Sequence, residues 1–186
     1  MDPAHYALQT ILNLFDHPQN VRNRVLLCFE RVLEIKPSNE DYNALAAACV
    51  FHVHNGLQMQ TSCEEIERIT RVPFSKIQTN HLLITEALAA WRHQDFIKQI
   101  CAPLNVSPTV QATAIETYMK AVNCEVNTRK FIRYSDRDAI AAAIVYRACQ
   151  FSDSPKTMLE IGETVSVSEG DMLQAYEKLL LLPNYM

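Results

Sequence analysis

The chain has 186 residues, of which 48% are hydrophobic and 20% charged, and its formal net charge is −4. This composition is ordinary for a globular protein with room for one large or two small domains, and three glycines are too few for Gly-rich phosphate loops or a hairpin-rich β fold. No apolar run approaches the roughly 20 residues of a membrane span, and the N-terminus lacks the basic and apolar regions of a secretory signal, so we expect neither.

The first half of the chain predicts five helices, because apolar residues recur at helical spacing between capping signals and breaks. These signals are, in chain order, Asp16-His-Pro18, Lys36-Pro37, Ser38-x-x-Asp41, Gly56, Ser62-x-x-Glu65 and Val72-Pro73. The third helix carries eight consecutive apolar residues, Ala44 to Phe51, so other helices must enclose it on every side. We expect the fifth helix to end near Ala90.

The second half predicts the same scheme after a joint at Trp91-Arg-His-Gln94. Its signals are an apolar helix over residues 96–104, the N-cap and proline Ser107-Pro108, and the capping spacings Ser135-x-x-Asp138, Thr157-x-x-Glu160 and Ser168-x-x-Asp171. Eight apolar residues, Ala139 to Tyr146, again mark the third helix. The second half differs in length only between its second and third helices, where extra residues lie around 127–134.

An internal repeat relates the two halves. Asn43-Ala-Leu-Ala-Ala-Ala-Cys-Val-Phe51 returns ninety-five positions later as Asp138-Ala-Ile-Ala-Ala-Ala-Ile-Val-Tyr146, and the register holds from Ser62 through its counterpart Thr157. The small alanine side chains would let surrounding helices come close. The sequence therefore predicts an all-α fold of two five-helix domains, residues 1–91 and 92–186, each built around a buried central helix.

No pattern in the sequence predicts catalysis. There is no nucleophile elbow, no H-E-x-x-H pair and no Gly-rich loop. The six cysteines form no C-x-x-C pair, and we interpret them as small buried hydrophobes in a reducing compartment. His52-x-His54 does not predict a chelate, because residues two apart on a helix point to nearly opposite sides. We therefore expect no enzyme activity, no cofactor and no metal site.

Two five-helix repeats around a buried third helix resemble the cyclin box, and specifically the core of the transcription initiation factor IIB family. The residues that carry this resemblance are Asp138-Ala-Ile-Ala-Ala-Ala-Ile-Val-Tyr-Arg-Ala-Cys-Gln150, the loop 152–156, Thr157-x-x-Glu-Ile-Gly162, Val165-Ser-Val167 and a last helix with Tyr176. The resemblance covers the whole chain. The first repeat is more diverged, with His52 and His54 where the family prefers apolar or small residues.

The resemblance implies a nuclear, monomeric general initiation factor core. It would bind the TATA-binding protein on bent promoter DNA and help to recruit RNA polymerase II. The family's full protein begins with a zinc ribbon that is not in this sequence, so we expect the chain to be a fragment that contains the C-terminal core. Residues 1–90 carry seven basic and ten acidic residues, and residues 91–186 carry ten and eleven. Because neither half is basic, we expect weak DNA binding by the chain alone, mainly to phosphates.

The strongest candidate for DNA binding is Arg129-Lys-Phe-Ile-Arg-Tyr134, followed by Arg137. Cations and aromatics in an extended connection suit backbone phosphates, and the alternative is a solvated loop whose apolar residues enter the core. The family places phosphate contacts just before this third helix, which favours Arg133. In the first repeat, Arg68, Arg71 and Lys76 surround the turn into the fifth helix, where ordinary surface charge is the alternative. The predicted DNA-binding residues are Arg129, Lys130, Arg133, Arg137, Arg71 and Lys76.

Residues 157–181 have the order of a helix-turn-helix, whose second helix can present its first residues to the major groove. Simple packing on the central helix, as in a cyclin without DNA, is the alternative. Within the family, positions aligned with Gly170, Asp171 and Leu173 reach base edges upstream of the TATA element. This helix instead begins Ser168-Glu-Gly-Asp171, with two acids and no arginine, so we expect little or no reading of that sequence.

Two other functions share the predicted fold. A cyclin, the regulatory subunit of a protein kinase, carries a lysine just after the central helix, and the position aligned through Phe51 is Asn55 here. The related initiation factor of RNA polymerase III shares both repeats, and the sequence does not separate the two polymerase systems.

Overall fold

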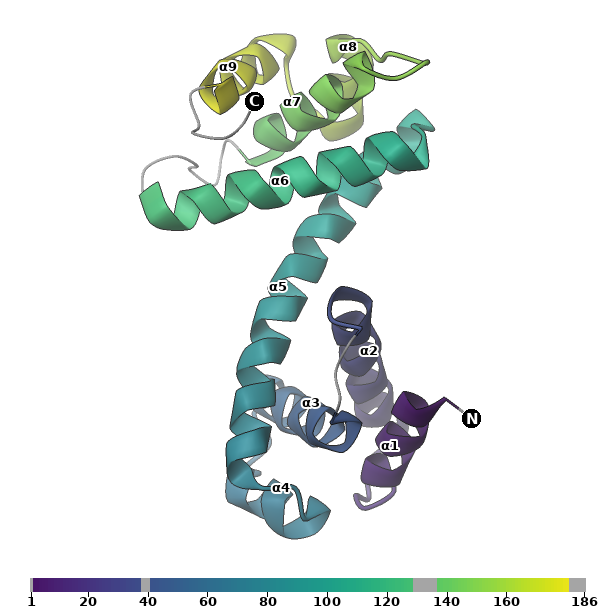
Figure 1. The fold of residues 1–186 in the computed structure, drawn as a ribbon, viewed down its shortest axis with the longest axis vertical. Helices are drawn as coiled ribbons and strands as arrows, with labels where there is room; N and C mark the ends of the chain where they lie inside the picture. Colours follow the sequence, from purple (N-terminus) through teal and green to yellow (C-terminus); the bar gives the residue numbers. More distant parts are fainter. Residues whose placement is uncertain (1, 38–40, 129–136, 181–186) are drawn as a thin grey trace. The chain divides into compact units, whose positions relative to one another are not determined.

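The computed structural model describes residues 2–37, 41–128 and 137–180, and for 123–128 it describes only the backbone (Figure 1). Every regular element in these ranges is a helix, so the all-α prediction is confirmed. The helices are α1 (Pro3–Leu12), α2 (Gln19–Ile35), α3 (Tyr42–Gly56), α4 (Cys63–Thr70), α5 (Phe74–Leu104), α6 (Pro108–Thr128), α7 (Arg137–Gln150), α8 (Met158–Val165) and α9 (Glu169–Leu180). None of the helices in the described ranges combines the length and the apolar character that a membrane crossing needs.

The chain divides into two compact units, residues 1–91 and 92–186. In the first unit, α3 packs against α1, α2 and α4. Every residue of α3 from Ala44 to Val50 is completely buried. This burial explains the run of small side chains, because four alanines in this helix leave room for its neighbours.

The second unit repeats this arrangement around α7, which packs against α6, α8 and α9. Residues Ala139 to Val145 of α7 are all buried, and they form one core with residues of the neighbouring helices. The prediction of a buried central helix in each half is therefore confirmed.

A single helix joins the two units, where the sequence predicted two helices separated near residues 91–94. Helix α5 runs without a break from Phe74 to Leu104. The intervening Trp91-Arg-His-Gln94 contains neither glycine nor proline, so nothing there interrupts the helical hydrogen bonds. The expected end near Ala90 is wrong. Ile77 and Ile84 of α5 belong to the core of the first unit, whereas Ile97 and Ile100 belong to that of the second.

Most predicted caps are present. Thr157 and Glu160 form a complete capping box at α8, and the Ser62 and Ser168 hydroxyls accept hydrogen bonds from the backbone N–H of Glu65 and Asp171. The start of α3 differs from the prediction. Asp41 is itself the N-cap and accepts a hydrogen bond from the Ala44 N–H at 3.1 Å. The predicted partners Ser38 and Ser135 lie outside the described residues.

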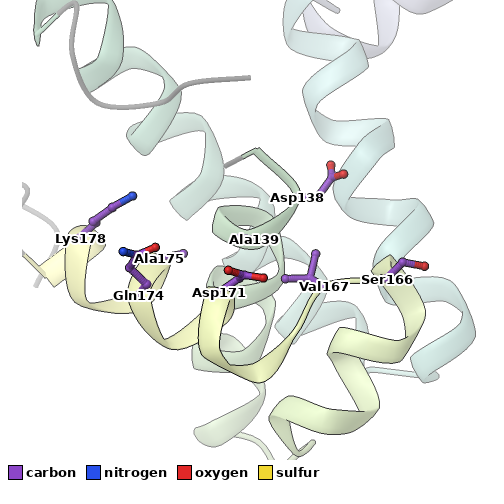
Figure 2. A pocket seen from close by; sticks show the side chains of 8 residues that line it. All are labelled: Asp138, Ala139, Ser166, Val167, Asp171, Gln174, Ala175 and Lys178. Carbon is purple, nitrogen blue, oxygen red and sulfur yellow. The ribbon is translucent and has the colours of Figure 1, made fainter. Parts of the chain in front are cut away.

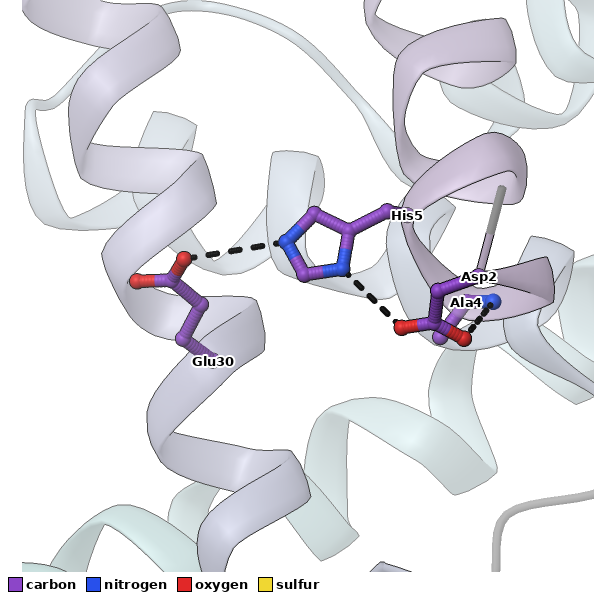
Figure 3. Close-up of polar contacts among 4 residues, drawn as sticks. All are labelled: Asp2, Ala4, His5 and Glu30. Carbon is purple, nitrogen blue, oxygen red and sulfur yellow. Dashed lines mark hydrogen bonds and ion pairs between the residues drawn. The ribbon is translucent and has the colours of Figure 1, made fainter.

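The first turn of α1 makes local polar contacts and one exposed contact with α2 (Figure 3). The Asp2 carboxylate caps α1 by accepting a hydrogen bond from the Ala4 N–H at 3.2 Å. The His5 ring lies between two carboxylates, with Nδ1 3.1 Å from Asp2 and Nε2 3.8 Å from Glu30 of α2. The contact with His5 is the main reason that the pKa of Asp2 is lowered.

Candidate nucleic-acid interface

The predicted helix-turn-helix of the second unit is formed by α8, a tight turn and α9. Ser166 ends α8 in the left-handed conformation, with φ of 58°. The Val167 N–H then donates to the Gly162 carbonyl at 2.9 Å. A Cβ atom at Gly162 would lie 2.4 Å from the Val167 carbonyl oxygen, so any other residue there would force the turn away from the helix. Gly162 therefore fixes where α9 begins.

A cavity of about 370 Å³ lies between the start of α7, the turn and one side of α9 (Figure 2). Its lining residues are Asp138, Ala139, Ser166, Val167, Asp171, Gln174, Ala175 and Lys178. The two carboxylates lie near the turn, and Lys178 lies farther along α9. The lining of this cavity thus carries two carboxylates and one ammonium group. Its net negative charge disfavours the binding of a phosphate beside the turn.

The acid at the start of α9 has a local structural role. Asp171 accepts a hydrogen bond from the Ser168 hydroxyl at 2.6 Å, and its own N–H donates back to that oxygen at 3.1 Å. A carboxylate at a helix N-terminus also interacts favourably with the helix dipole. Leu173, which the resemblance in the sequence aligned with a base-contacting position, is 48% exposed, and its side chain offers no hydrogen-bond donor.

The first unit has a related turn with different charges. Arg71 ends α4 in the left-handed conformation, with φ of 60°, and its N–H donates to the Glu67 carbonyl at 2.8 Å. Arg71 and Ser166 are ninety-five positions apart, so the left-handed residues match in register. The turns differ after them, because the position that matches Gly162 is Glu67, and the Val72 N–H donates to the Thr70 hydroxyl at 3.3 Å. The Arg71 residue is exposed at the surface of the unit.

Lys76, in the first turns of α5, is already engaged within its unit. Its ammonium lies 2.6 Å from the carboxylate of Asp41, the N-cap of α3. This hydrogen bond is the main reason that the pKa of Asp41 lies below its ordinary value. Both side chains are well exposed, and an ion pair of this kind contributes about 0–1 kcal/mol. A phosphate could therefore compete for Lys76 at little energetic cost.

Arg137 is the one residue of the predicted second-repeat cluster that lies within the described ranges. Its guanidinium carbon sits 4.1 Å from the centre of the Phe96 ring, and its Nε donates to the Tyr118 hydroxyl at 3.3 Å. These contacts hold the cation at the start of α7. Arg129, Lys130 and Arg133 lie outside the described residues.

Another basic grouping was missed in the sequence. Arg24 and Arg31 of α2 and His52 of α3 line a groove of about 240 Å³ in the first unit. Leu27, Cys28, Val53, Gly56 and Leu88 complete its lining. The spacing of seven between the two arginines, which places them on one face of a helix, is the signal that could have found it.

Comparisons with known proteins agree with this geometry. A family model described as the transcription factor TFIIB repeat matches residues 89–181, half of the chain. Proteins called transcription initiation factor IIB from Xenopus laevis and Homo sapiens are each 26% identical over 178 residues. These matches cover 91% and 93% of this chain and 55% of each relative. A factor of the same name from Saccharolobus shibatae is 23% identical over 181 residues, which cover 95% of this chain and 58% of that protein.

The chain thus spans little more than half the length of these relatives. The family match begins in the second part of α5 and ends one residue after α9, and it covers the half whose motifs carried the resemblance in the sequence. The first unit encloses an equivalent central helix. With two tandem cyclin-like repeats, the chain belongs to the transcription factor TFIIB repeat family, as a diverged member.

Proposed function

We propose that this chain is the core of a general transcription initiation factor. It binds the complex of the TATA-binding protein with promoter DNA and helps to recruit RNA polymerase II, as a nuclear monomer without a cofactor or enzyme activity. The observation that carries the proposal is the TFIIB repeat match over a unit whose α8, turn and α9 form a helix-turn-helix. The names of the relatives, all transcription initiation factors, support it.

The contacts with DNA are made mainly to phosphates. Arg71, at an exposed turn, and Arg137, held at the start of α7, present cations from fixed positions. Arg129, Lys130 and Arg133 precede α7 in the sequence, and Lys76 follows Arg71. With a chain net charge of −4, these contacts are weak alone and become useful once the TATA-binding protein has bent and marked the site.

A gel-shift assay with defined components tests this function. Promoter DNA is incubated with the chain, with the TATA-binding protein and with both, over a series of salt concentrations. We expect a slower-migrating ternary complex and little binding by the chain alone. Replacing Arg129, Lys130 and Arg133 by Ala should weaken that complex and reduce the salt dependence by up to about 0.9 in log–log slope per lost phosphate contact.

A matched pair of single variants controls for net charge. Arg133→Ala and Lys120→Ala each remove one positive charge from the second unit. Lys120 lies on α6 in an exposed ion pair with Glu116 at 2.7 Å, and it is not part of the proposed interface. Equal salt slopes for these two variants would remove Arg133 from the interface. Absence of any ternary complex would contradict the proposed function.

The proteins that co-purify with this chain from nuclear extract distinguish the proposed function from the two alternatives, an RNA polymerase III initiation factor and a cyclin. Subunits of RNA polymerase II together with the TATA-binding protein would support the proposal, whereas subunits of RNA polymerase III would assign the chain to that system. Recovery of a protein kinase would instead indicate a cyclin-type regulatory subunit, despite Asn55 where cyclins carry lysine.

A further inference from the structure

The groove lined by Arg24 and Arg31 combines two cations with apolar side chains. Helices α2, α3 and α5 of the first unit all contribute to its lining. Arg24, Leu27 and Arg31 follow one another at spacings of three and four residues, so they share one face of α2. Leu27 is 48% exposed, and Val53 of α3 and Leu88 of α5 are buried. The two arginines are therefore about 10 Å apart along the helix axis, with apolar surface between them.

Arg31 is held by a residue that does not line the groove. Its guanidinium carbon lies 4.0 Å from the centre of the Trp91 ring. The indole N–H of Trp91 in turn donates to the carboxylate of Glu34 at 2.9 Å. Stacking on an aromatic ring restricts the guanidinium, but its N–H groups can still donate to a partner. A cation that is already ordered loses less conformational entropy when it binds.

The charge of the groove favours an acidic partner. Among the described residues that line it, none carries a carboxylate. Glu30 and Glu34, the acidic residues of α2, contact His5 and Trp91. The chain as a whole has a net charge of −4, so the groove is a local concentration of positive charge on an acidic protein. Carboxylates that enter it would be attracted by both arginines.

The second unit has a groove at the matching place, with different chemistry. This groove measures about 220 Å³, and its α6 side is lined by Thr113 and Thr117, without an arginine. Three more of its lining residues lie ninety-five positions after lining residues of the first groove, namely Arg147, Ala148 and Phe151 after His52, Val53 and Gly56. The pair of arginines on the second helix is therefore a property of the first unit and not of the shared scaffold.

We propose that the Arg24–Arg31 groove binds an acidic amphipathic helix of a partner protein. The matching helix carries the pattern acid-x-x-apolar-apolar-x-x-acid, which places two carboxylates two turns apart on one face with apolar side chains between them. The carboxylates accept hydrogen bonds from the two guanidinium groups. The apolar side chains cover Leu27 and contact Val53 and Leu88.

A protein helix fits this groove better than nucleic acid does. Phosphates would pair with the arginines, but they would leave the exposed Leu27 and the apolar lining uncovered. Neither Arg71 nor Lys76 lines the groove, so this surface is additional to the proposed DNA contacts. The chain could then hold promoter DNA and a protein partner through different surfaces.

Fluorescence anisotropy of a labelled peptide titrated with the intact chain tests the groove. The probe is an alanine-rich helical peptide that contains Glu-x-x-Leu-Leu-x-x-Glu. The control peptide has the same composition, with its glutamates on the side of the helix opposite the leucines. We expect saturable binding of the probe, about tenfold tighter than binding of the control. Equal affinities, or no saturable binding, would overturn the proposal. The assay contains neither DNA nor the TATA-binding protein, so its result does not depend on the proposed function.

Variants of exposed side chains identify the contacts. Arg24→Glu and Leu27→Asn should each weaken binding of the probe by about tenfold, and circular dichroism verifies that both are folded. Lys36→Glu, at the exposed end of α2, and Arg147→Glu, in the groove of the second unit, make the same charge change as Arg24→Glu and should leave the affinity unchanged. Unchanged affinity in the folded Arg24 and Leu27 variants would overturn the proposal.

A charge swap tests the pairing directly. The double variant Arg24→Glu/Arg31→Glu should lose the probe and bind a peptide in which lysines replace both glutamates. The same variant is titrated with labelled duplex DNA. Unchanged DNA binding would support a groove for protein. Loss of DNA binding together with failure to bind the lysine peptide would assign the groove to nucleic acid and overturn the proposal.

Discussion

In the first unit, residues 62–76 contain three acidic residues, Glu64, Glu65 and Glu67, and three basic residues, Arg68, Arg71 and Lys76. The corresponding residues 157–171 of the second unit contain four acidic residues, Glu160, Glu163, Glu169 and Asp171, and no basic residue. Both segments nevertheless build a helix, a left-handed residue and the start of a second helix. One scaffold therefore presents a neutral, partly basic surface in one unit and an acidic surface in the other.

This difference distinguishes the residues that stabilise the fold from the residues that determine what the surface can bind. Matching positions Ser62 and Thr157 cap a helix in both units. Lys76 and Asp171 also occupy matching positions, yet Lys76 forms an ion pair with the N-cap of α3, whereas Asp171 accepts a hydrogen bond from Ser168, the residue that caps its own helix. Because the second unit is acidic at this turn, we propose that its phosphate contacts involve the basic residues that precede α7 in the sequence and not the start of α9.

The largest expected effect tests the shared scaffold. Ala47 and Ala142 occupy matching positions in α3 and α7 and are both completely buried. Ala47→Leu or Ala142→Leu should overpack the core and lower the free energy of unfolding by up to about 3 kcal/mol. Thermal or urea denaturation measures this loss. The exposed positions Ala89 and Ala112 provide controls, since Leu there meets solvent. Parental stability in both core variants would contradict the enclosed central helices.

A somewhat smaller effect tests the turn of the second unit. Gly162→Ala should destabilise the chain by about 2 kcal/mol, because the new Cβ would overlap a backbone carbonyl that cannot rotate away. Gly170→Ala is the matched control. Its Cβ meets only the Ser168 hydroxyl at 3.8 Å, so the replacement should be neutral or stabilise the helix by about 0.4–1 kcal/mol. The ranking of the two midpoints in urea decides, and a reversed order would contradict the close approach at this turn.

The sequence was sufficient for much of this scaffold, because its signals are local. Eight consecutive apolar residues predict each central helix, and short capping patterns such as Thr157-x-x-Glu160 predict where helices begin. The continuous α5 was missed because the repeat suggested a boundary where the chain has no helix-breaking residue. A repeat shows where equivalent residues recur. Whether a helix continues across the boundary between two repeats depends on whether glycine, proline or a cap interrupts it.

Contacts between helices could not be predicted in the same way. The pairing of Lys76 with Asp41 and of His17 with His54 depends on how segments distant in sequence lie against each other. The identity of Arg137 marked it as a candidate, but its packing on Phe96 required the fold. Of the candidate interface, the residue types and their order came from the sequence, and the contacts of Lys76 and Arg137 came from tertiary structure.

The third prediction, with a smaller expected effect than the replacement of Gly162, concerns DNA binding at the acidic turn of the second unit. Specific reading of bases commonly uses arginine against guanine. The resemblance in the sequence implies that such a residue would stand at the position of Leu173. Leu173→Arg should strengthen the ternary complex on G/C-rich upstream DNA by up to about tenfold, or about 1.4 kcal/mol. Competition gel shifts with scrambled upstream sequence measure the preference. The unmodified chain should show little, and a tenfold preference without the replacement would mean that the reading helix is misplaced.

The smallest effect is one of pH, and it distinguishes the two units again. His54, at the end of α3, lies with its Nε2 2.7 Å from Nε2 of His17, whereas the matching position in the second unit is Cys149. When both rings are neutral, the Nε2–H of one ring can donate a hydrogen bond to the unprotonated Nε2 of the other. Two charged rings would both be donors and would repel each other. Burial is the main reason that the pKa of each histidine is lowered, with a further contribution from Arg22 at His17 and from His17 at His54.

Because both folded-state pKa values lie below the unfolded value of about 6.5, the unfolded chain binds more protons in acid. The contribution of the pair to stability is therefore complete above about pH 6.5 and is lost as the pH falls through the lower folded-state values. Urea midpoints measured between pH 7.5 and pH 5 should decrease, and His54→Cys, which installs the residue of the second unit, should flatten the decrease even if it lowers every midpoint. An equal slope in that variant would show that the carboxylates and the other histidines, and not this pair, set the acid sensitivity of the chain.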